Sequence, residues 1–264
     1  MDKLKFTLIQ SNLHWENVDS NLAMFTQKIE ALSEPSNIII LPEMFNTGFS
    51  MESEKLAETM NGKTVNWMQE MARKTNSVIV GSIIITEHEE YYNRLIWAEP
   101  EGDIHTYDKR HLFRMANENE YFSAGKDLLI VHYKGWRICP LVCYDLRFPV
   151  WSRNVDENGN NIYDCLIYIA NWPAARKAPW SKLLEARAIE NQCYVVGLNR
   201  VGIDGKLIDY SGNSAVINPK GEAISSIKEN ADTVQTISIS LNELNDFREK
   251  FPVGMDADRF EIKT

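Results

Sequence analysis

The chain has 264 residues, of which 28 are Lys or Arg and 37 are Asp or Glu, so its formal net charge is −9. With 44% hydrophobic and 25% charged residues it has the composition of a globular protein, and it is long enough to bury a core without disulfides or a structural metal. The acidic balance argues against binding of nucleic acid or of anionic membranes, because both depend on basic surface.

The number and spacing of the cysteines indicate whether the protein belongs to a reducing or an oxidising compartment. There are four, at positions 139, 143, 165 and 193 of a long chain, whereas disulfide-built domains are short and rich in cysteine. The N-terminal residues lead into a strand-like pattern without the apolar run of a signal peptide. No apolar run approaches the roughly 20 residues that span a bilayer. We therefore expect a cytoplasmic protein with free thiols and no membrane partner.

The first part of the chain alternates apolar runs with amphipathic helical patterns. Strands are expected at residues 6–10, 38–41 and 78–86, and helices over 22–32 and 65–74. The run 38–41 is aliphatic throughout, which is typical of a strand buried on both faces. Asp19 or Ser20 is a suitable cap for the first helix.

From residue 92 onward the pattern predicts strand pairs with tight turns. Strands are expected at 94–98, 104–107, 128–132, 136–143, 166–170, 194–198, 214–218, 223–226 and 234–239, and helices at 179–191 and 241–251. No repeat or linker divides the chain, so a single domain over residues 1–264 is predicted. Two layers of mixed sheet with helices outside them accommodate this many strands.

Three polar residues each follow an apolar strand at its carboxyl end, which is where open α/β sheets place their sites. Glu43 follows a buried run, and burial raises a carboxyl pKa toward the value that suits a general base. Cys143 lies at a strand-to-turn junction, where backbone N–H groups lower a thiol pKa and bind an oxyanion. With the cation Lys109 they make a complete set for acyl transfer through a thioester.

Each of these residues also has an ordinary structural interpretation. Most buried cysteines are inert, and most lysines lie on the surface. A metal site at Cys139 and Cys143 is poorly supported, because no second cysteine pair matches their spacing and no histidine is near. The residues alone therefore leave the role of Cys143 open.

Three stretches carry a resemblance to a known family. They are residues 41–49, 107–113 and 141–149, and Glu43, Lys109 and Cys143 follow one another at separations of 66 and 34 positions. In this order the sequence resembles the nitrilase (carbon–nitrogen hydrolase) superfamily over nearly its whole length. The resemblance implies a four-layer α-β-β-α sandwich, with Glu43 as general base and Cys143 as nucleophile. It also implies that Lys109 and the backbone N–H of Tyr144 stabilise the oxyanion, with no metal or organic cofactor.

The family has one further glutamate, seven residues before a glycine. This spacing selects Glu118, seven residues before Gly125, while the neighbouring Glu120 remains an alternative. The implied role of this carboxylate is to hold Lys109 and to orient the substrate.

Within the superfamily, the stretches 44–49, 143–154 and 168–173 are most similar to the omega-amidase branch. This likeness implies hydrolysis of the terminal amide of small 2-oxo acids such as 2-oxoglutaramate and 2-oxosuccinamate. The small acidic substrate needs a cation for its far carboxylate, and Arg147 and Arg176 are the candidates. A structural salt bridge for Arg147 and a solvent-exposed position for Arg176 are the alternatives.

Candidate pocket walls, which are equally candidates for core packing, are Phe45, Phe49, Tyr144 and Trp172. Other activities stay open: hydrolysis of N-carbamoyl amino acids or of nitriles, and a non-catalytic assembly or regulatory role. A non-catalytic protein would be expected to lose one of the three key residues, and all three are present. Family members commonly pair through outer helices, so a homodimer through the helix at 179–191 is expected.

Overall fold

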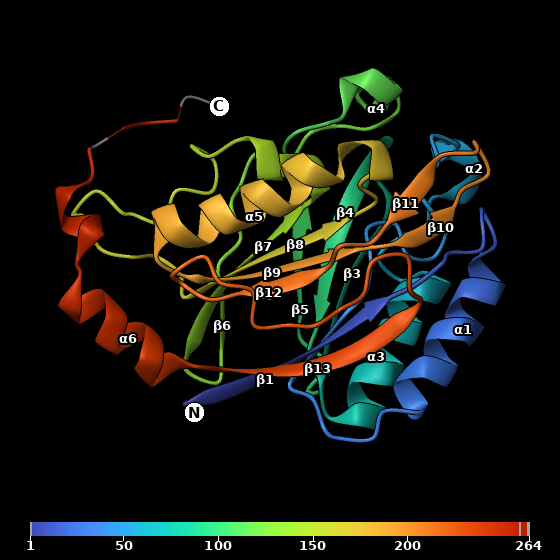
Figure 1. The fold of residues 1–264 in the computed structure, drawn as a ribbon. Helices are drawn as coiled ribbons and strands as arrows, with labels where there is room; N and C mark the ends of the chain where they lie inside the picture. The colour runs from blue at the N-terminus through green and yellow to red at the C-terminus, as the bar shows by residue number, and fades with distance from the viewer. Residues whose placement is uncertain (1, 259, 263–264) are drawn as a thin grey trace.

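The computed structural model describes residues 2–258 and 260–262, and it contains two large β-sheets (Figure 1). The first sheet has the order β13-β1-β2-β3-β4-β5. Its strands are β1 (Lys3–Gln10), β2 (Ile38–Ile40), β3 (Val78–Glu87), β4 (Glu90–Ala98), β5 (Ile104–Asp108) and β13 (Thr233–Ser240). The second has the order β12-β9-β8-β7-β6. Its strands are β6 (Val131–Tyr133), β7 (Trp136–Val142), β8 (Cys165–Ala170), β9 (Tyr194–Asn199) and β12 (Ala215–Ile217).

A separate hairpin and several helices complete the described chain. The hairpin is β10 (Val201–Ile203) with β11 (Asp209–Ser211). The α-helices are α1 (Val18–Glu30), α2 (Ser53–Leu56), α3 (Lys63–Thr75), α4 (Glu118–Tyr121), α5 (Lys177–Asn191) and α6 (Leu241–Lys250). Short 3₁₀ helices are η1 (Arg114–Ala116), η2 (Cys143–Arg147), η3 (Ala174–Arg176) and η4 (Val253–Asp256). Among the described residues, no helix is long and apolar enough to cross a membrane.

Strand β2 shows how the layers form. All three of its isoleucines are fully buried, but they belong to different parts of the core because successive side chains point to opposite faces. Ile38 and Ile40 pack with residues of the second sheet, such as Leu141. Ile39 packs on the other face with Phe25 of α1 and Met68 of α3. The two sheets therefore face each other, and α1 and α3 cover the outer face of the first.

Helix α5 covers the outer face of the second sheet (Figure 1). Its residues Trp180, Leu184 and Ala188 are buried in the same core cluster as β9. Gly197 of β9 lies directly beneath, and a Cβ there would meet Leu184 at 2.5 Å. The four-layer α-β-β-α sandwich that the family resemblance implies is confirmed.

The strand directions bring the key loops to one edge. In the first sheet β1, β2 and β3 are parallel, and β5 has the same direction because it is separated from β3 by the antiparallel β4. In the second sheet β7, β8 and β9 are parallel. The carboxyl ends of β2, β5, β7 and β8 carry the loops that meet in the site described below.

Several element boundaries differ from the sequence prediction. The first helix is capped by Asn17, whose side chain accepts from the backbone N–H of Ser20 at 3.0 Å, and not by Asp19 or Ser20. That helix ends at Glu30, so Leu32 lies beyond it. An Asn side chain two positions earlier provides the same acceptor chemistry, which sequence pattern does not resolve.

The strand pairs of the second half also differ. The strand predicted at 128–132 is the shorter β6, and the hairpin predicted at 223–226 is reduced to one bridge between Ile217 and Ala223. Ile224, Ser225 and Ser226 follow Ala223, and Ile224 is exposed; exposed segments of this kind pair weakly. The hairpin of β10 and β11 was not predicted, because each of its strands has only three residues.

Candidate active site

Glu43, Lys109 and Glu118 form a buried cluster at the carboxyl edge of the first sheet. Lys109 Nζ lies 2.8 Å from Glu43 Oε1, and 3.0 and 2.9 Å from the two carboxylate oxygens of Glu118. None of the three side chains is exposed to solvent. Of the two glutamates that the sequence left open, Glu118 therefore contacts Lys109, whereas Glu120 is exposed.

The loop after β5 is fixed on both sides of Lys109. Arg94 of β4 donates two hydrogen bonds to Asp108, at 2.7 and 2.9 Å, so the residue before Lys109 is clamped. On the other side, the N–H of Gly125 donates to the carbonyl of Lys109 at 3.1 Å. A Cβ at Gly125 would lie 2.1 Å from the carbonyl oxygen of Asp108, so only glycine fits there. This contact ties the segment that carries Glu118 to the lysine that Glu118 binds.

Asn93 of β4 is a further member of the cluster, which the sequence reasoning missed. Its Nδ2 donates to Glu43 Oε1 at 2.8 Å and to Glu118 Oε1 at 3.3 Å, and its side chain is fully buried. An asparagine inside a strand that is otherwise largely apolar was the available signal. Buried amides are retained where they satisfy other polar groups.

The cluster combines two carboxylates with one ammonium group. Burial alone would lower the pKa of Lys109, but attraction by Glu118 and Glu43 outweighs it and holds that pKa above its ordinary value, so Lys109 is charged. Burial raises the pKa of Glu118, assisted by repulsion from Glu43 and opposed by Lys109. A permanently charged lysine in a water-poor site is suited to stabilise a developing negative charge.

Cys143 begins the 3₁₀ helix η2, directly after β7. Its φ of 47° is in the left-handed region, which a residue with a side chain adopts at a cost of about 1–3 kcal/mol. Residue Cys143 is 8% exposed, and it lines a pocket. Burial, followed by repulsion from Glu43, raises the pKa of this thiol well above its ordinary value, despite the nearby charge of Lys109. The sequence-based expectation of a lowered thiol pKa is therefore wrong, because burial and Glu43 act in the opposite direction.

Asp145 braces the Cys143 turn against the Lys109 loop. One of its oxygens accepts from Tyr107 Oη at 2.8 Å and from the N–H of Val142 at 3.0 Å. The other oxygen lies 3.0 Å from the N–H of His111 and 2.8 Å from its Nδ1. The His111 ring stacks on Phe148 with centroids 3.7 Å apart, so the histidine orients the loop.

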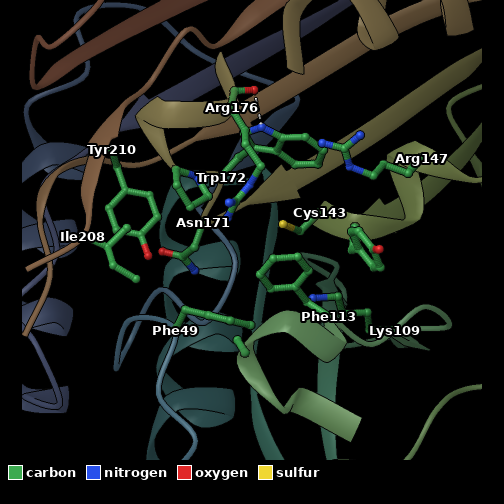
Figure 2. Close-up of a pocket in the computed structure, with 13 residues that line it drawn as sticks. Phe49, Lys109, Phe113, Cys143, Arg147, Asn171, Trp172, Arg176, Ile208 and Tyr210 are labelled. Atoms are coloured by element: carbon green, nitrogen blue, oxygen red, sulfur yellow. Dashed lines mark hydrogen bonds between the residues drawn. The ribbon is translucent and has the colours of Figure 1, made fainter. Parts of the chain in front are cut away.

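A pocket of about 60 Å³ opens onto the thiol (Figure 2). Figure 2 shows the sulfur of Cys143 near the middle, with Trp172 and Arg147 on one side and Lys109 on the other. The lining residues are Phe49, Lys109, Phe113, Ala116, Cys143, Tyr144, Arg147, Asn171, Trp172, Pro173, Arg176, Ile208 and Tyr210. Five of these residues are aromatic, and five others bring a thiol, an amide or a positive charge, so the wall combines apolar surface with polar groups as small-molecule sites do.

Two guanidinium groups line this pocket. Arg147 lies over the Trp172 ring at 4.9 Å, and Arg176 over the Phe113 ring at 5.2 Å. Within residues 2–258 and 260–262, neither has a carboxylate within 4.0 Å, so the structural salt bridge that the sequence left open as an alternative for Arg147 is not present there. Both charges are therefore available to an anionic ligand.

The structure places most of the predicted pocket residues as expected, with one exception. Tyr144, Arg147, Trp172, Arg176 and Phe49 all line the pocket. Phe45 does not: it is fully buried between Phe25 and Trp67, with centroid separations of 5.5 and 5.7 Å. Its assignment to the substrate pocket is corrected to core packing, because the turn after Glu43 directs it under the first sheet.

Asn171, Phe113, Ile208 and Tyr210 also line the pocket and were not singled out from the sequence. Asn171 directly follows β8, so the rule that identified Cys143 would also have found it. Ile208 and Tyr210 belong to the hairpin region that the sequence did not predict.

The comparisons with known proteins agree with this geometry. The family model for carbon–nitrogen hydrolases matches residues 6–249. An Escherichia coli K12 protein named Omega-amidase YafV is 46% identical over 99% of this chain and 100% of its own length. A Bacillus subtilis 2-oxoglutaramate amidase is 31% identical over 96% of this chain and 98% of its own.

Among solved structures, XC1258 from Xanthomonas campestris, described as a CN-hydrolase superfamily protein with an arsenic adduct in its active site, matches with a TM-score of 0.96. The identity is 41%, and all of both chains is covered. The chain belongs to the carbon–nitrogen hydrolase (nitrilase) superfamily, and within it to the omega-amidase branch. It is a hydrolase that acts on carbon–nitrogen bonds other than peptide bonds.

Proposed function

We propose that this enzyme hydrolyses the terminal amide of small 2-oxo acid monoamides, namely 2-oxoglutaramate and 2-oxosuccinamate, to the dicarboxylate and ammonia. The observation that carries the proposal is the pocket itself. It joins a thiol, a buried lysine–glutamate cluster and two arginines without carboxylate partners. The relatives named omega-amidase and 2-oxoglutaramate amidase support the same substrate class.

In the first half-reaction the amide carbon bonds to the sulfur of Cys143. The thiol proton passes to the carboxylate of Glu43 as the carbon–sulfur bond forms, because the resting thiol is neutral. The resulting oxyanion is stabilised by Lys109 and the backbone N–H of Tyr144. Glu43 then gives its proton to the amide nitrogen, the carbon–nitrogen bond breaks, and ammonia leaves a thioester on Cys143.

In the second half-reaction water replaces ammonia. Glu43 takes a proton from the water as the oxygen bonds to the thioester carbon. The carbon–sulfur bond then breaks, and the proton on Glu43 returns to the sulfur of Cys143. The enzyme is restored with one amide and one water consumed, and one carboxylic acid and one ammonia formed.

The far carboxylate of the substrate is assigned to Arg147, with Arg176 beside it. Arg147 belongs to η2, the same short helix that begins with Cys143, so the distance between nucleophile and cation is fixed by one turn. Its stacking on Trp172 holds the guanidinium plane in one orientation. The Glu43–Lys109–Glu118 cluster has two carboxylates and one ammonium group, so by itself it would repel an anionic substrate. The positive charges of Arg147 and Arg176 counteract this repulsion.

A substrate panel tests the proposal. Ammonia release is measured for 2-oxoglutaramate, 2-oxosuccinamate, glutamine, a nitrile and an N-carbamoyl amino acid, with C143A as the blank. Release from the two 2-oxo amides alone is expected. Turnover of the nitrile or the carbamoyl compound, without turnover of the oxo amides, would replace the proposed substrate class by one of the other family activities.

We also propose that the enzyme works as a cytoplasmic homodimer paired through α5. Ile189 on this helix is 54% exposed, a large apolar side chain that a second copy would cover. Sedimentation equilibrium of the protein and of Ile189→Lys tests this, since a monomeric parent would contradict it.

A further inference from the structure

Asn93 contacts all three charged residues of the buried cluster. Its side-chain Nδ2 donates to Glu43 Oε1 at 2.8 Å and to Glu118 Oε1 at 3.3 Å. Its backbone carbonyl accepts a hydrogen bond from the N–H of Lys109 at 3.0 Å. One residue inside β4 therefore holds the lysine by its backbone and both glutamates by its side chain.

The neighbours of the Asn93 amide determine which way it faces. An ionised carboxylate has only acceptor oxygens, so the NH₂ group has to face Glu43 and Glu118. The other end of the amide, Asn93 Oδ1, is buried and has no hydrogen-bond partner within the described part of the chain. An unpaired buried acceptor destabilises a fold, so the contribution of this side chain lies in its two donors.

The two glutamates need more than one shared donor to remain ionised next to each other. Burial and then repulsion from Glu43 act together to raise the pKa of Glu118, against the charge of Lys109. Of the described side chains, only Lys109 and Asn93 donate to both carboxylates. A hydrogen bond to the ionised form of a carboxyl group favours that form, and an amide provides the bond without adding a charge.

We propose that Asn93 is a positioning residue that keeps Glu43 and Glu118 ionised side by side. Glu43 is then able to take the proton of Cys143 at neutral pH, while Glu118 remains a counterion for Lys109. Asn93 does not line the pocket, so it acts through the cluster and not on the substrate. This inference rests on the proposed amidase function, in which Glu43 is the base.

The titratable groups around Glu43 decide what a pH profile reports. They are Lys109 after β5, Glu118 of α4, Cys143 of η2 and Tyr210 of β11. Burial raises the pKa of Cys143 and of Tyr210; burial lowers that of Lys109, but attraction by the two glutamates raises it more. The acid limb, where kcat/KM falls with decreasing pH, therefore reports protonation of the carboxylates.

Two substitutions with opposite effects on the pH profile of kcat/KM test the proposal. Asn93→Leu keeps the volume but removes the donors, so the acid limb should move to higher pH by about 1–2 units, the value of one hydrogen bond to a charged group. Asn93→Asp keeps the shape, but a carboxyl group donates only while it is protonated. The Asp variant should therefore lose activity with rising pH, with an alkaline limb at lower pH than in the parent.

Asn154 provides the matched control. It is also a buried asparagine, but its Nδ2 donates to the backbone carbonyls of Tyr163 and Asn191 and not to a carboxylate. Asn154→Leu and Asn154→Asp should lower the midpoint of urea unfolding without moving either limb.

A purely structural role of Asn93 would lower kcat/KM by the same factor at every pH. Unshifted limbs in a folded Asn93 variant therefore overturn the proposal. If Asn93→Leu does not fold, the alkaline limb of Asn93→Asp decides alone. Failure of both variants to fold would assign Asn93 to the stability of the fold and would also overturn the proposal.

The choice of substrate separates this inference from the proposed function. The assay is ammonia release from whichever compound of the substrate panel the parent hydrolyses. If that compound is a nitrile or an N-carbamoyl amino acid, the 2-oxo substrate assignment fails, while the limb shifts still decide the role of Asn93. If the parent releases ammonia from none of them, the proposed function is overturned and the role of Asn93 with it.

Discussion

Glu118→Gln is the most informative change to the buried cluster, because it removes one charge at nearly constant volume. Four hydrogen bonds from three donors converge on the two oxygens of Glu118: two from Lys109 Nζ, one from the N–H of Phe113 at 2.6 Å, and one from Asn93 Nδ2 at 3.3 Å. A glutamine has one acceptor oxygen and an NH₂ group. In either orientation its NH₂ group faces at least one of these donors.

The magnitude follows from burial. Breaking a buried ion pair by removing one partner costs about 3–5 kcal/mol, and Glu43 remains as a counterion for Lys109, so we expect the lower end, about 3 kcal/mol. For a protein of this size that corresponds to a fall in Tm of about 6–12 °C. Misplacement of Lys109 should lower kcat by about 100- to 1000-fold, the usual effect of losing an oxyanion donor.

The assays are urea unfolding at pH 7 and ammonia release from 2-oxoglutaramate. Glu120→Gln is the control: it makes the same chemical change two residues away on α4, but at an exposed side chain. It should stay within about 0.5 kcal/mol of the parent, with unchanged kcat. Equal behaviour of the two variants would refute the reasoning that Glu118 holds Lys109.

Three further predictions follow from the site and the core. Arg147→Met should raise KM for 2-oxoglutaramate about 10- to 100-fold while changing KM for a neutral amide little, and equal changes for both would contradict carboxylate binding. Because the pKa of Cys143 is raised, its alkylation by iodoacetamide should keep accelerating above pH 9, and a plateau below pH 8 would indicate a thiolate instead. Burial raises the pKa of Asp164, but hydrogen bonds and charge from Arg137 outweigh this and hold that pKa below its ordinary value. Asp164→Asn should therefore lose about 2 kcal/mol of unfolding free energy at pH 7, a deficit that shrinks below about pH 4 as the parent carboxylate is protonated, and a deficit independent of pH would contradict the ion pair.

The sequence predicted the layers of the fold well because they depend on local patterns. An all-aliphatic run such as 38–41 has to be buried on both faces, and the structure places Ile39 and Ile40 in different layers. Short elements were less predictable. The β10–β11 hairpin has three residues in each strand, too few for a periodic signal, yet it carries Tyr210 to the pocket.

For the site, too, some residues could be identified from the sequence and others only from the structure. Position after an apolar strand singled out Glu43, Lys109 and Cys143 as candidates, and the resemblance to the family added their proposed roles and, through the spacing to Gly125, Glu118. The core position of Phe45 was not readable, because it depends on how the turn after Glu43 packs under the first sheet.

What the sequence determined by itself is the set of functional groups and the strands that carry them, since hydrophobic periodicity and residue chemistry are local properties. The tertiary structure decided which of these groups touch. It selected Glu118 over Glu120 and placed Asn93 beneath both carboxylates. It also reversed the expected direction of the Cys143 pKa, because burial and the charge of Glu43 arise only when residues 100 positions apart meet.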